Sequence, residues 1–233
     1  MIILLTGLTG SGKTDCLHGL AAAGEQVLNL ELLARHRGSA FGGMGLGPQP
    51  SHESFQTAVR ARQAAADPAR PLWVEAEGDY IGSVGLPQGL KDSMVVAPRI
   101  EIVADVTDRI RRIVATYGGY PLHEWLAALD RVERRLGPAL AHSVRTALMA
   151  GALDAAVELL LCYYDRGYAN RNRSRKGRLL GTVTATVPGN WAPLSEIQSS
   201  RGTTFDVSKV LVAGRLCSSS AALGNFEWRG IQI

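Results

Sequence analysis

Cysteine is scarce in this chain, and the few cysteines follow no pattern. The three are Cys16, Cys162 and Cys217, an odd number spread over 233 residues with no C-x-x-C pair. A disulfide framework needs paired cysteines, and a structural zinc site needs clustered ones. The sequence therefore argues against both, and we expect each cysteine to be a small buried hydrophobic residue.

Long apolar runs and internal repeats are also lacking. The apolar start at residues 1–5 is far too short to span a bilayer, and no basic segment precedes it. We therefore expect neither a signal peptide nor a membrane anchor, no membrane partner, and a cytoplasmic location. The ordinary apolar content, 46% of residues, is typical of a soluble globular protein of this length.

The most informative stretch is Gly7-Leu8-Thr9-Gly10-Ser11-Gly12-Lys13-Thr14, which follows the phosphate-loop (P-loop) pattern. An apolar strand is expected before it, and a helix over residues 15–23 after it. Glycines permit the positive φ angles that turn successive N–H groups toward phosphate oxygens, and a helix N-terminus adds positive potential. The alternative is an ordinary glycine-rich turn. The predicted phosphate-binding residues are Gly7, Gly10, Ser11, Gly12, Lys13 and Thr14.

Three side chains are predicted to act on the bound phosphates. Lys13 would reach the terminal phosphates, and Thr14 would offer its hydroxyl to Mg²⁺. The apolar strand at residues 71–77 ends in carboxylates, and an acid at this place holds Mg²⁺ through water or orients the attacking group. We select Glu75, with Glu77 behind it; the alternative is a surface or helix-capping glutamate. Lys13 and Glu75 are thus the catalytic candidates, and Thr14 and Glu75 the metal candidates.

Positive charge is concentrated late in the chain. Residues 1–165 hold 15 Lys and Arg against 18 Asp and Glu, whereas residues 166–233 hold 10 against 3. Such a run suits a polyanion such as RNA, because neutralising phosphates releases counterions. A solvated basic linker is the alternative. The basic residues of the run are Arg166, Arg171, Arg173, Arg175, Lys176 and Arg178.

Two further basic groups have two interpretations each, and a third group has one. In the glycine-rich loop at residues 34–45, Arg35, His36 and Arg37 would close a second positive wall around pyrophosphate or contact RNA, or the loop is merely a mobile surface segment. Arg131, Arg134 and Arg135, near the end of a predicted helix, would form a lid over phosphates or complement the helix dipole. We expect Arg109, Arg111 and Arg112 to point mostly outward.

The pattern of apolar segments predicts an α/β fold of the P-loop NTPase type, with three α/β/α layers and a mainly parallel sheet. We place a P-loop domain at residues 1–168 and a basic linker and irregular tail at residues 169–233. Residues 81–90 are expected to be an irregular connection. Strands are expected at residues 1–5, 26–30, 71–77, 99–103, 179–187 and 207–212. Helices are expected at residues 15–23, 108–117, 123–136, 138–150 and 152–164. A further helix is expected to start at Ser51.

Several strings go beyond the general P-loop pattern. Over Ile2 to Tyr168 the chain resembles the P-loop half of the tRNA 2-selenouridine synthases. The strings are Leu5 to Thr14, Leu30-Glu31, His36 to Gly42, Gln49-Pro50-Ser51, Trp73-Val74-Glu75 with Ile81-Gly82, and Tyr163-Tyr164-Asp165. Where the family usually continues with proline, this chain has Arg166, and residues beyond Arg178 cannot be matched.

The resemblance implies an activity on tRNA. Members of the family exchange the sulfur of wobble 2-thiouridine for selenium from selenophosphate, through an S-geranyl intermediate made from geranyl pyrophosphate. A rhodanese-like domain precedes their P-loop half and has no counterpart in these 233 residues, so we expect selenium exchange to need a separate rhodanese protein. The resemblance places the basic loop and the basic run where they would take part in tRNA binding.

Two other functions remain open at this point. A small-molecule or nucleotide kinase using ATP shares the strand, the P-loop, the acid at the strand end and a lid with arginines. A non-catalytic module that holds tRNA or nucleotide for a rhodanese protein is the second.

Overall fold

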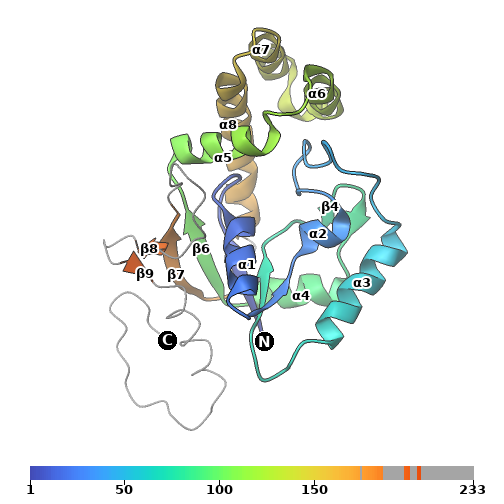
Figure 1. Cartoon of the computed structure of the whole chain (residues 1–233), viewed down its shortest axis with the longest axis vertical. Coiled ribbons are helices and arrows are strands. Elements are labelled where there is room, and N and C mark those ends of the chain that lie inside the picture. Colours follow the sequence, from blue (N-terminus) through green and yellow to red (C-terminus); the bar gives the residue numbers. More distant parts are fainter. Residues whose placement is uncertain (174, 186–196, 200–203, 206–233) are drawn as a thin grey trace.

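A mainly parallel sheet forms the centre of the computed structural model, which describes residues 1–173, 175–185, 197–199 and 204–205 (Figure 1). Five of its strands, β2, β3, β1, β6 and β7, run parallel, and β8 and β9 add an antiparallel edge. This confirms the predicted α/β class. In spatial order the strands are β2 (Gln26–Leu28), β3 (Leu72–Glu75), β1 (Ile2–Thr6), β6 (Arg99–Val103), β7 (Leu179–Thr184), β8 (Ile197–Ser199) and β9 (Thr204–Phe205).

The helices lie on both faces of the sheet and in a lobe beyond it (Figure 1). A small hairpin of β4 (Tyr80–Ile81) and β5 (Val84–Gly85), followed by α4, occupies the stretch that we expected to be irregular. The helices are α1 (Lys13–Ala22), α2 (Leu30–Ala34), α3 (His52–Ala64), α4 (Gln88–Val96), α5 (Val106–Tyr117), α6 (Leu122–Leu136), α7 (Pro138–Met149) and α8 (Leu153–Arg173).

Alternation along β1 produces the two cores of the sheet. Successive side chains of a strand point to opposite faces, so Ile3 and Leu5 share one core and Leu4 belongs to the other. The first core packs against Leu17 and Leu20 of α1. The second contains Phe55 of α3 and Met94 of α4, among other residues. With helices packed on both of its faces, the sheet is the middle of three α/β/α layers, as the sequence predicted.

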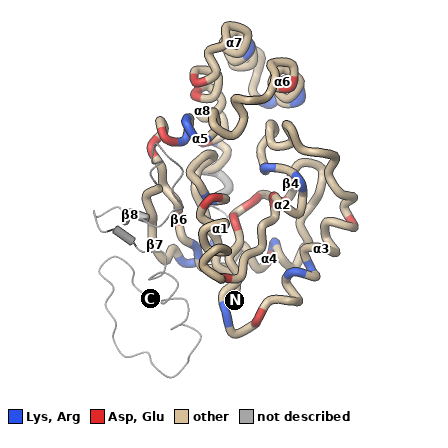
Figure 2. Tube along the Cα trace, viewed as in Figure 1, with Lys and Arg blue, Asp and Glu red and all other residues tan. Residues whose placement is uncertain are grey.

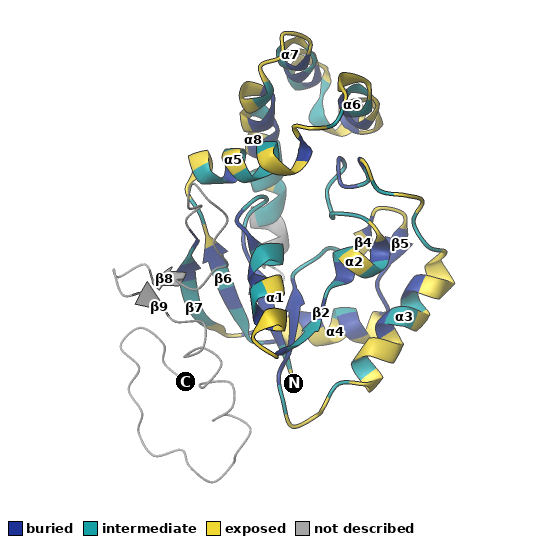
Figure 3. Ribbon diagram, viewed as in Figure 1, coloured by how far each residue is buried: buried dark blue, intermediate teal, exposed yellow. Residues whose placement is uncertain are grey.

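A third core lies in the lobe formed by α5 to α8. The buried faces of α6, α7 and α8 turn toward one another (Figure 3), and Trp125 and Leu129 of α6 are almost fully buried there. Phe41 and Met44 belong to the same core although they come from the loop after α2. The Phe41 and Trp125 rings lie 5.4 Å apart between centroids. The glycine-rich loop therefore packs on the lobe.

The sheet continues past the expected domain boundary at residue 168. Helix α8 runs through that position, and β7 pairs with β6 in parallel. The strand expected at residues 207–212 lies outside the described residues. Among the cysteines, Cys16 is buried as predicted, Cys162 is exposed and contradicts the prediction, and Cys217 lies outside the described residues.

Candidate phosphate and metal site

The P-loop joins the end of β1 to the start of α1. Gly10 and Gly12 adopt φ angles of 77° and 96°, values that favour glycine because they strain residues with a Cβ. Gly12 is the N-cap of α1 and supplies no side-chain hydrogen bond to that helix. The N–H groups of the first turn are thus left for a ligand.

Lys13 and Ser11 have different surroundings in the loop. The Lys13 ammonium donates to the carbonyls of Gly7 at 3.0 Å and Leu8 at 3.3 Å, so it lies folded over the loop. The Ser11 hydroxyl is buried and has no hydrogen-bond partner in the described part of the chain. Both groups are next to the N–H groups predicted to hold phosphate.

Strand register brings Glu75 to the P-loop. Leu5 of β1 pairs with Glu75 of β3, so the carboxylate lies beside the strand that leads into the loop. The Thr14 hydroxyl donates to Glu75 Oε2 at 2.9 Å. Glu75 is fully buried, and its other oxygen has no hydrogen-bond partner among the described residues. The two residues predicted to bind metal thus lie in direct contact.

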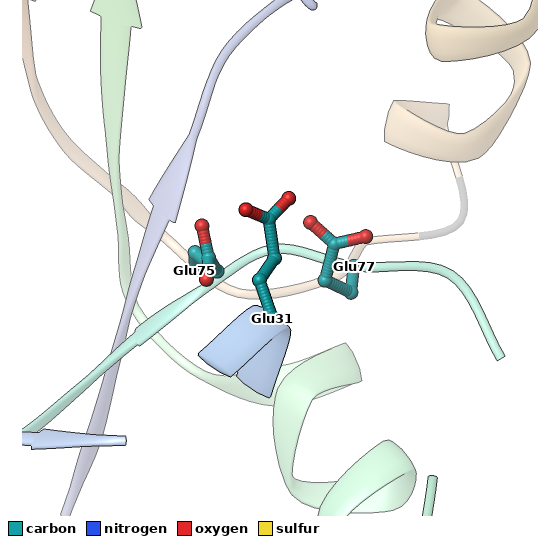
Figure 4. Close-up of side chains that lie close together, drawn as sticks. All are labelled: Glu31, Glu75 and Glu77. Atoms are coloured by element: carbon teal, nitrogen blue, oxygen red, sulfur yellow. The ribbon is translucent and has the colours of Figure 1, made fainter. Parts of the chain in front are cut away.

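Two more carboxylates complete a cluster with Glu75. Glu31 and Glu77 each place an oxygen so that the three ligand atoms lie within 4.8 Å of one another (Figure 4). Asn29 caps α2 by accepting the Leu32 N–H at 2.8 Å, which puts Glu31 in the first turn. Carboxylate and hydroxyl oxygens suit Mg²⁺, and the buried oxygen of Glu75 leaves one ligand position unused. The donor set therefore fits a magnesium ion.

Burial and mutual repulsion raise the pKa values of this cluster. The pKa of Glu31 rises from 4.5 to about 9, first because of burial and then because of the charges of Glu75 and Glu77. Burial likewise raises the pKa of Glu75, although the Thr14 hydroxyl and the Lys13 charge oppose the shift. Three carboxylates cannot all ionise cheaply in a dry site, and a bound cation would remove that cost.

We expect Glu31→Gln to flatten the pH dependence of stability in the cation-free chain. Because the Glu31 pKa is about 9 in the folded state and ordinarily 4.5, folded stability falls as pH rises between those values. In EDTA near pH 8.5 the variant should unfold roughly 2–4 °C above wild type, the shift given by about 1 kcal/mol in a domain of this size. Near pH 5 the two should coincide. The control is Glu53→Gln, at the exposed start of α3. If Glu31→Gln changes the unfolding temperature equally at both pH values, the expectation is contradicted.

A cavity of about 1490 Å³ opens between the P-loop and the helical lobe. Its polar side contains the P-loop, Glu31 and Glu77. The glycine-rich loop and the lobe line it with both apolar and basic side chains. The apolar lining residues include Phe41, Ile113, Trp125, Val132, Leu160 and Leu161.

Basic side chains from several elements border this cavity. Figure 2 marks the positions of Lys and Arg along the backbone. Arg35 and His36 line it, and the pKa of His36 is lowered by burial and by the charges of Arg131 and Arg37. Arg135 lines it as predicted, and so does Arg131, whereas Arg134 is exposed and does not border it. The sequence predicted Arg131, Arg134 and Arg135 as one cluster. It could not show which of them border the cavity.

Arg37 has a structural role in the loop. It donates to the Met44 carbonyl at 2.9 Å and to the Tyr120 hydroxyl at 3.3 Å. Its guanidinium also lies over the Tyr117 ring, 5.3 Å from the centroid. These contacts tie the loop to α5 and the segment after it. Arg37 also lines the cavity, and these two hydrogen bonds use two of its five N–H donors.

The basic run is divided between α8 and the segment before β7. Arg171 and Arg173 lie in the last turn of α8, and their side chains are outside the described part. Arg166 and Arg175 line the cavity, and Arg175 also donates to the Glu77 carbonyl at 3.3 Å. Lys176 is exposed, while its backbone N–H donates to Val95.

Two arginines of α5 correct the sequence prediction. Arg109 was expected to point outward but is buried, 3% exposed. Arg112 donates to Asp15 at 2.9 Å and to the Gly10 carbonyl at 3.0 Å. Arg109 pairs with Asp165 of α8 and Arg112 with Asp15 of α1, and each also donates to a carbonyl of the P-loop. Arg111 is exposed, as predicted.

The parallel sheet, the glycine loop between β1 and α1, and the acid at the end of β3 define a P-loop type α/β protein. No helix within the described residues has the length and apolar character needed to cross a membrane. The family model for the "tRNA 2-selenouridine synthase AAA domain" matches residues 1–192. The chain belongs to this family.

Individual relatives agree with the family assignment. The tRNA 2-selenouridine synthase of Cupriavidus necator is 33% identical over 220 residues, which cover 81% of this chain and 58% of the relative. The protein of that name from Shewanella denitrificans is 30% identical over 210 residues, covering 77% and 56%. The chain therefore spans a little more than half the length of these relatives.

Proposed function

We propose that this chain is a tRNA-modifying transferase module that attaches the geranyl group of geranyl pyrophosphate to the sulfur of wobble 2-thiouridine. One observation carries the proposal: a single cavity is lined by the P-loop, by carboxylates, and by apolar and basic side chains of the helical lobe. A prenyl pyrophosphate has groups that suit both kinds of lining, a charged head and a hydrocarbon chain. The family relation supports tRNA as the second substrate.

The polar side supplies what a pyrophosphate leaving group needs. Backbone N–H groups of the P-loop and the Lys13 ammonium would hold its oxygens, and Arg131 and Arg135 of α6 would approach them from the lobe. Thr14, Glu31 and Glu75 would hold Mg²⁺, which when bound neutralises charge on the departing oxygens. Fixed donors at the position where negative charge develops lower the barrier without reorganising.

The apolar lining would hold the hydrocarbon chain. Ile113, Val132 and Leu160 border the cavity from three different helices, and Ile113, which is only partly buried, offers most of the apolar surface among them. Excluding water there also protects an allylic carbon that is losing its leaving group. The base of a nucleoside triphosphate also packs against apolar side chains, so titration with ATP is needed to separate the two ligands.

The reaction requires no protein nucleophile. The bond between geranyl C1 and the pyrophosphate oxygen breaks, and a lone pair of the 2-thiouridine sulfur forms the new C–S bond. The N3 proton of the base is released, so that the product is an S-alkylated pyrimidine and free pyrophosphate. Conversion to 2-selenouridine would additionally need selenophosphate and a rhodanese domain, and the part of the chain that the structure describes contains no such domain.

The test is direct. The chain is incubated with tRNA carrying 2-thiouridine and with geranyl pyrophosphate, and the digested nucleosides are examined by mass spectrometry. We expect S-geranyl-2-thiouridine from wild type and none from Lys13→Ala. Product only after a rhodanese protein is added would instead support a binding module. Preferred ATP binding with phosphate transfer to a small acceptor would support the kinase alternative.

We expect the end of α8 to contribute to tRNA binding through charge. Arg171→Ala/Arg173→Ala removes two cations from its last turn. Binding should weaken, and the slope of log K against log salt should become shallower by about 1.4–1.8, because each phosphate contact contributes roughly 0.7–0.9. Filter binding at several salt concentrations measures this slope. The matched control is Arg60→Ala/Arg62→Ala on α3; equal slopes for both pairs would assign Arg171 and Arg173 to a passive segment.

A further inference from the structure

We propose that Arg109 and Asp165 are positioning residues that hold the peptide units of the P-loop in the orientation that binds phosphate. The inference rests on the proposed binding of pyrophosphate at this loop. It also gives a role to the Tyr163-Tyr164-Asp165 string, which lies on α8, about 150 residues after the P-loop in the sequence.

The guanidinium of Arg109 is fixed by three hydrogen bonds. Nη1 donates to Asp165 Oδ2 at 3.0 Å, Nη2 donates to Asp165 Oδ1 at 2.6 Å, and Nε donates to the Thr9 carbonyl at 2.8 Å. The Arg109 side chain is 4% exposed and that of Asp165 35%. A guanidinium is planar and its donors form a rigid fork, so a bidentate carboxylate on one side determines where Nε points. Asp165 therefore sets the direction of the bond to Thr9.

The bond to Thr9 fixes a peptide unit of the P-loop. A peptide group is planar and trans, so holding the Thr9 carbonyl toward Arg109 turns the Gly10 N–H to the opposite side. The next carbonyl, that of Gly10, accepts from Arg112 at 3.0 Å, and Arg112 is held in turn by Asp15 at 2.9 Å. Two successive peptides are thus anchored from α5.

A loop of this composition needs such anchors. Glycine visits many backbone conformations at little cost, so Gly10 and Gly12 do not hold the loop in one shape by themselves. Helix α5 lies directly behind the loop: a Cβ on Gly10 would come within 2.9 Å of the Ile113 side chain. Asp105 caps α5 by accepting the Thr107 N–H, which places Arg109 and Arg112 on successive turns facing the loop.

Electrostatics and positioning make opposite predictions for Asp165. Its neighbours Tyr164 and Arg166 line the cavity, so its charge lies close to the anion site. Removing a negative charge near an anion strengthens binding by Coulomb attraction. If Asp165 only neutralised Arg109, Asp165→Asn would therefore bind pyrophosphate as well as wild type or better. Loss of positioning weakens binding instead.

The experiment is titration calorimetry of the whole chain with inorganic pyrophosphate. We expect Asp165→Asn to bind about tenfold more weakly, in the range found when residues that orient a binding group are removed. The control is Asp130→Asn, which breaks the exposed pair of Asp130 with Arg145, 2.7 Å apart, on α6 and α7. It should bind within about twofold of wild type. Binding by Asp165→Asn that is unchanged or tighter would overturn the proposal.

Two further variants keep the test decisive. Arg109→Lys retains the charge but cannot form the fork, so it should also bind about tenfold more weakly. If circular dichroism shows that Asp165→Asn is unfolded, Asp165→Glu replaces it in the test. This variant keeps the charge and displaces it by one methylene. Weaker pyrophosphate binding by Asp165→Glu supports the proposal, and unchanged binding overturns it. A folded wild-type chain that binds no pyrophosphate would overturn the proposed function together with this inference.

Discussion

Lys13→Ala should reduce the affinity for geranyl pyrophosphate by roughly 30-fold or more. Removing one partner of a desolvated, hydrogen-bonded charge pair costs about 2–5 kcal/mol, and every 1.4 kcal/mol is about tenfold. In the ligand-free chain the ammonium lies on the Gly7 and Leu8 carbonyls, within reach of the phosphate position. Titration calorimetry with geranyl pyrophosphate measures the loss.

The specificity of this result depends on two comparisons. Lys91→Ala removes the same charge from α4, and Lys91 does not line the cavity, so its affinity should stay close to that of wild type. Titration with ATP separates the proposed transferase from a kinase. Wild type that binds ATP far more tightly than geranyl pyrophosphate would contradict the transferase, even if Lys13→Ala weakens both.

Glu75→Gln should abolish the effect of Mg²⁺ on pyrophosphate binding. In wild type we expect Mg²⁺ to strengthen binding by at least about tenfold, because Glu31 and Glu75 would hold the ion and its charge would offset that of the phosphates. The amide of glutamine keeps the size of Glu75 but lacks the charge of the fully buried carboxylate. Calorimetry with and without Mg²⁺ then gives nearly equal affinities for the variant.

A glutamate outside the cluster provides the control for charge alone. Glu158 is exposed on α8, and Glu158→Gln should keep the full response to Mg²⁺. If Glu75→Gln also keeps that response, the cluster of Glu31, Glu75 and Glu77 is not the cation site. A variant with no pyrophosphate binding at all, under either condition, would assign Glu75 to the shape of the loop rather than to metal.

The sequence predicted best where local patterns determine structure. Glycine spacing identified the P-loop, and the apolar run before Glu75 identified a buried strand that ends in a carboxylate. Glu31 was missed as a site residue because its approach to Glu75 depends on how α2 packs beside β3. Its position after the capping Asn29 was the available signal.

The arginines show a second limit of sequence interpretation. Helical periodicity placed Arg109 on the outside, since a helix pattern carries no information about a carboxylate on another helix. The polar residues after Asp165 suggested a linker, yet they continue α8. Arginine is a good helix former, so a basic segment can extend a helix without apolar residues.

The packing of Phe41 against Trp125 has a consequence for how ligands enter and leave. Because Phe41 and Met44 belong to the core of the helical lobe, the glycine-rich loop is not an independent flap over the cavity. Withdrawing it would expose apolar surface and break the aromatic contact. Opening by a shift of the lobe and the loop together leaves that core intact, so the rate of product release should follow the stability of contacts between the lobe and the sheet.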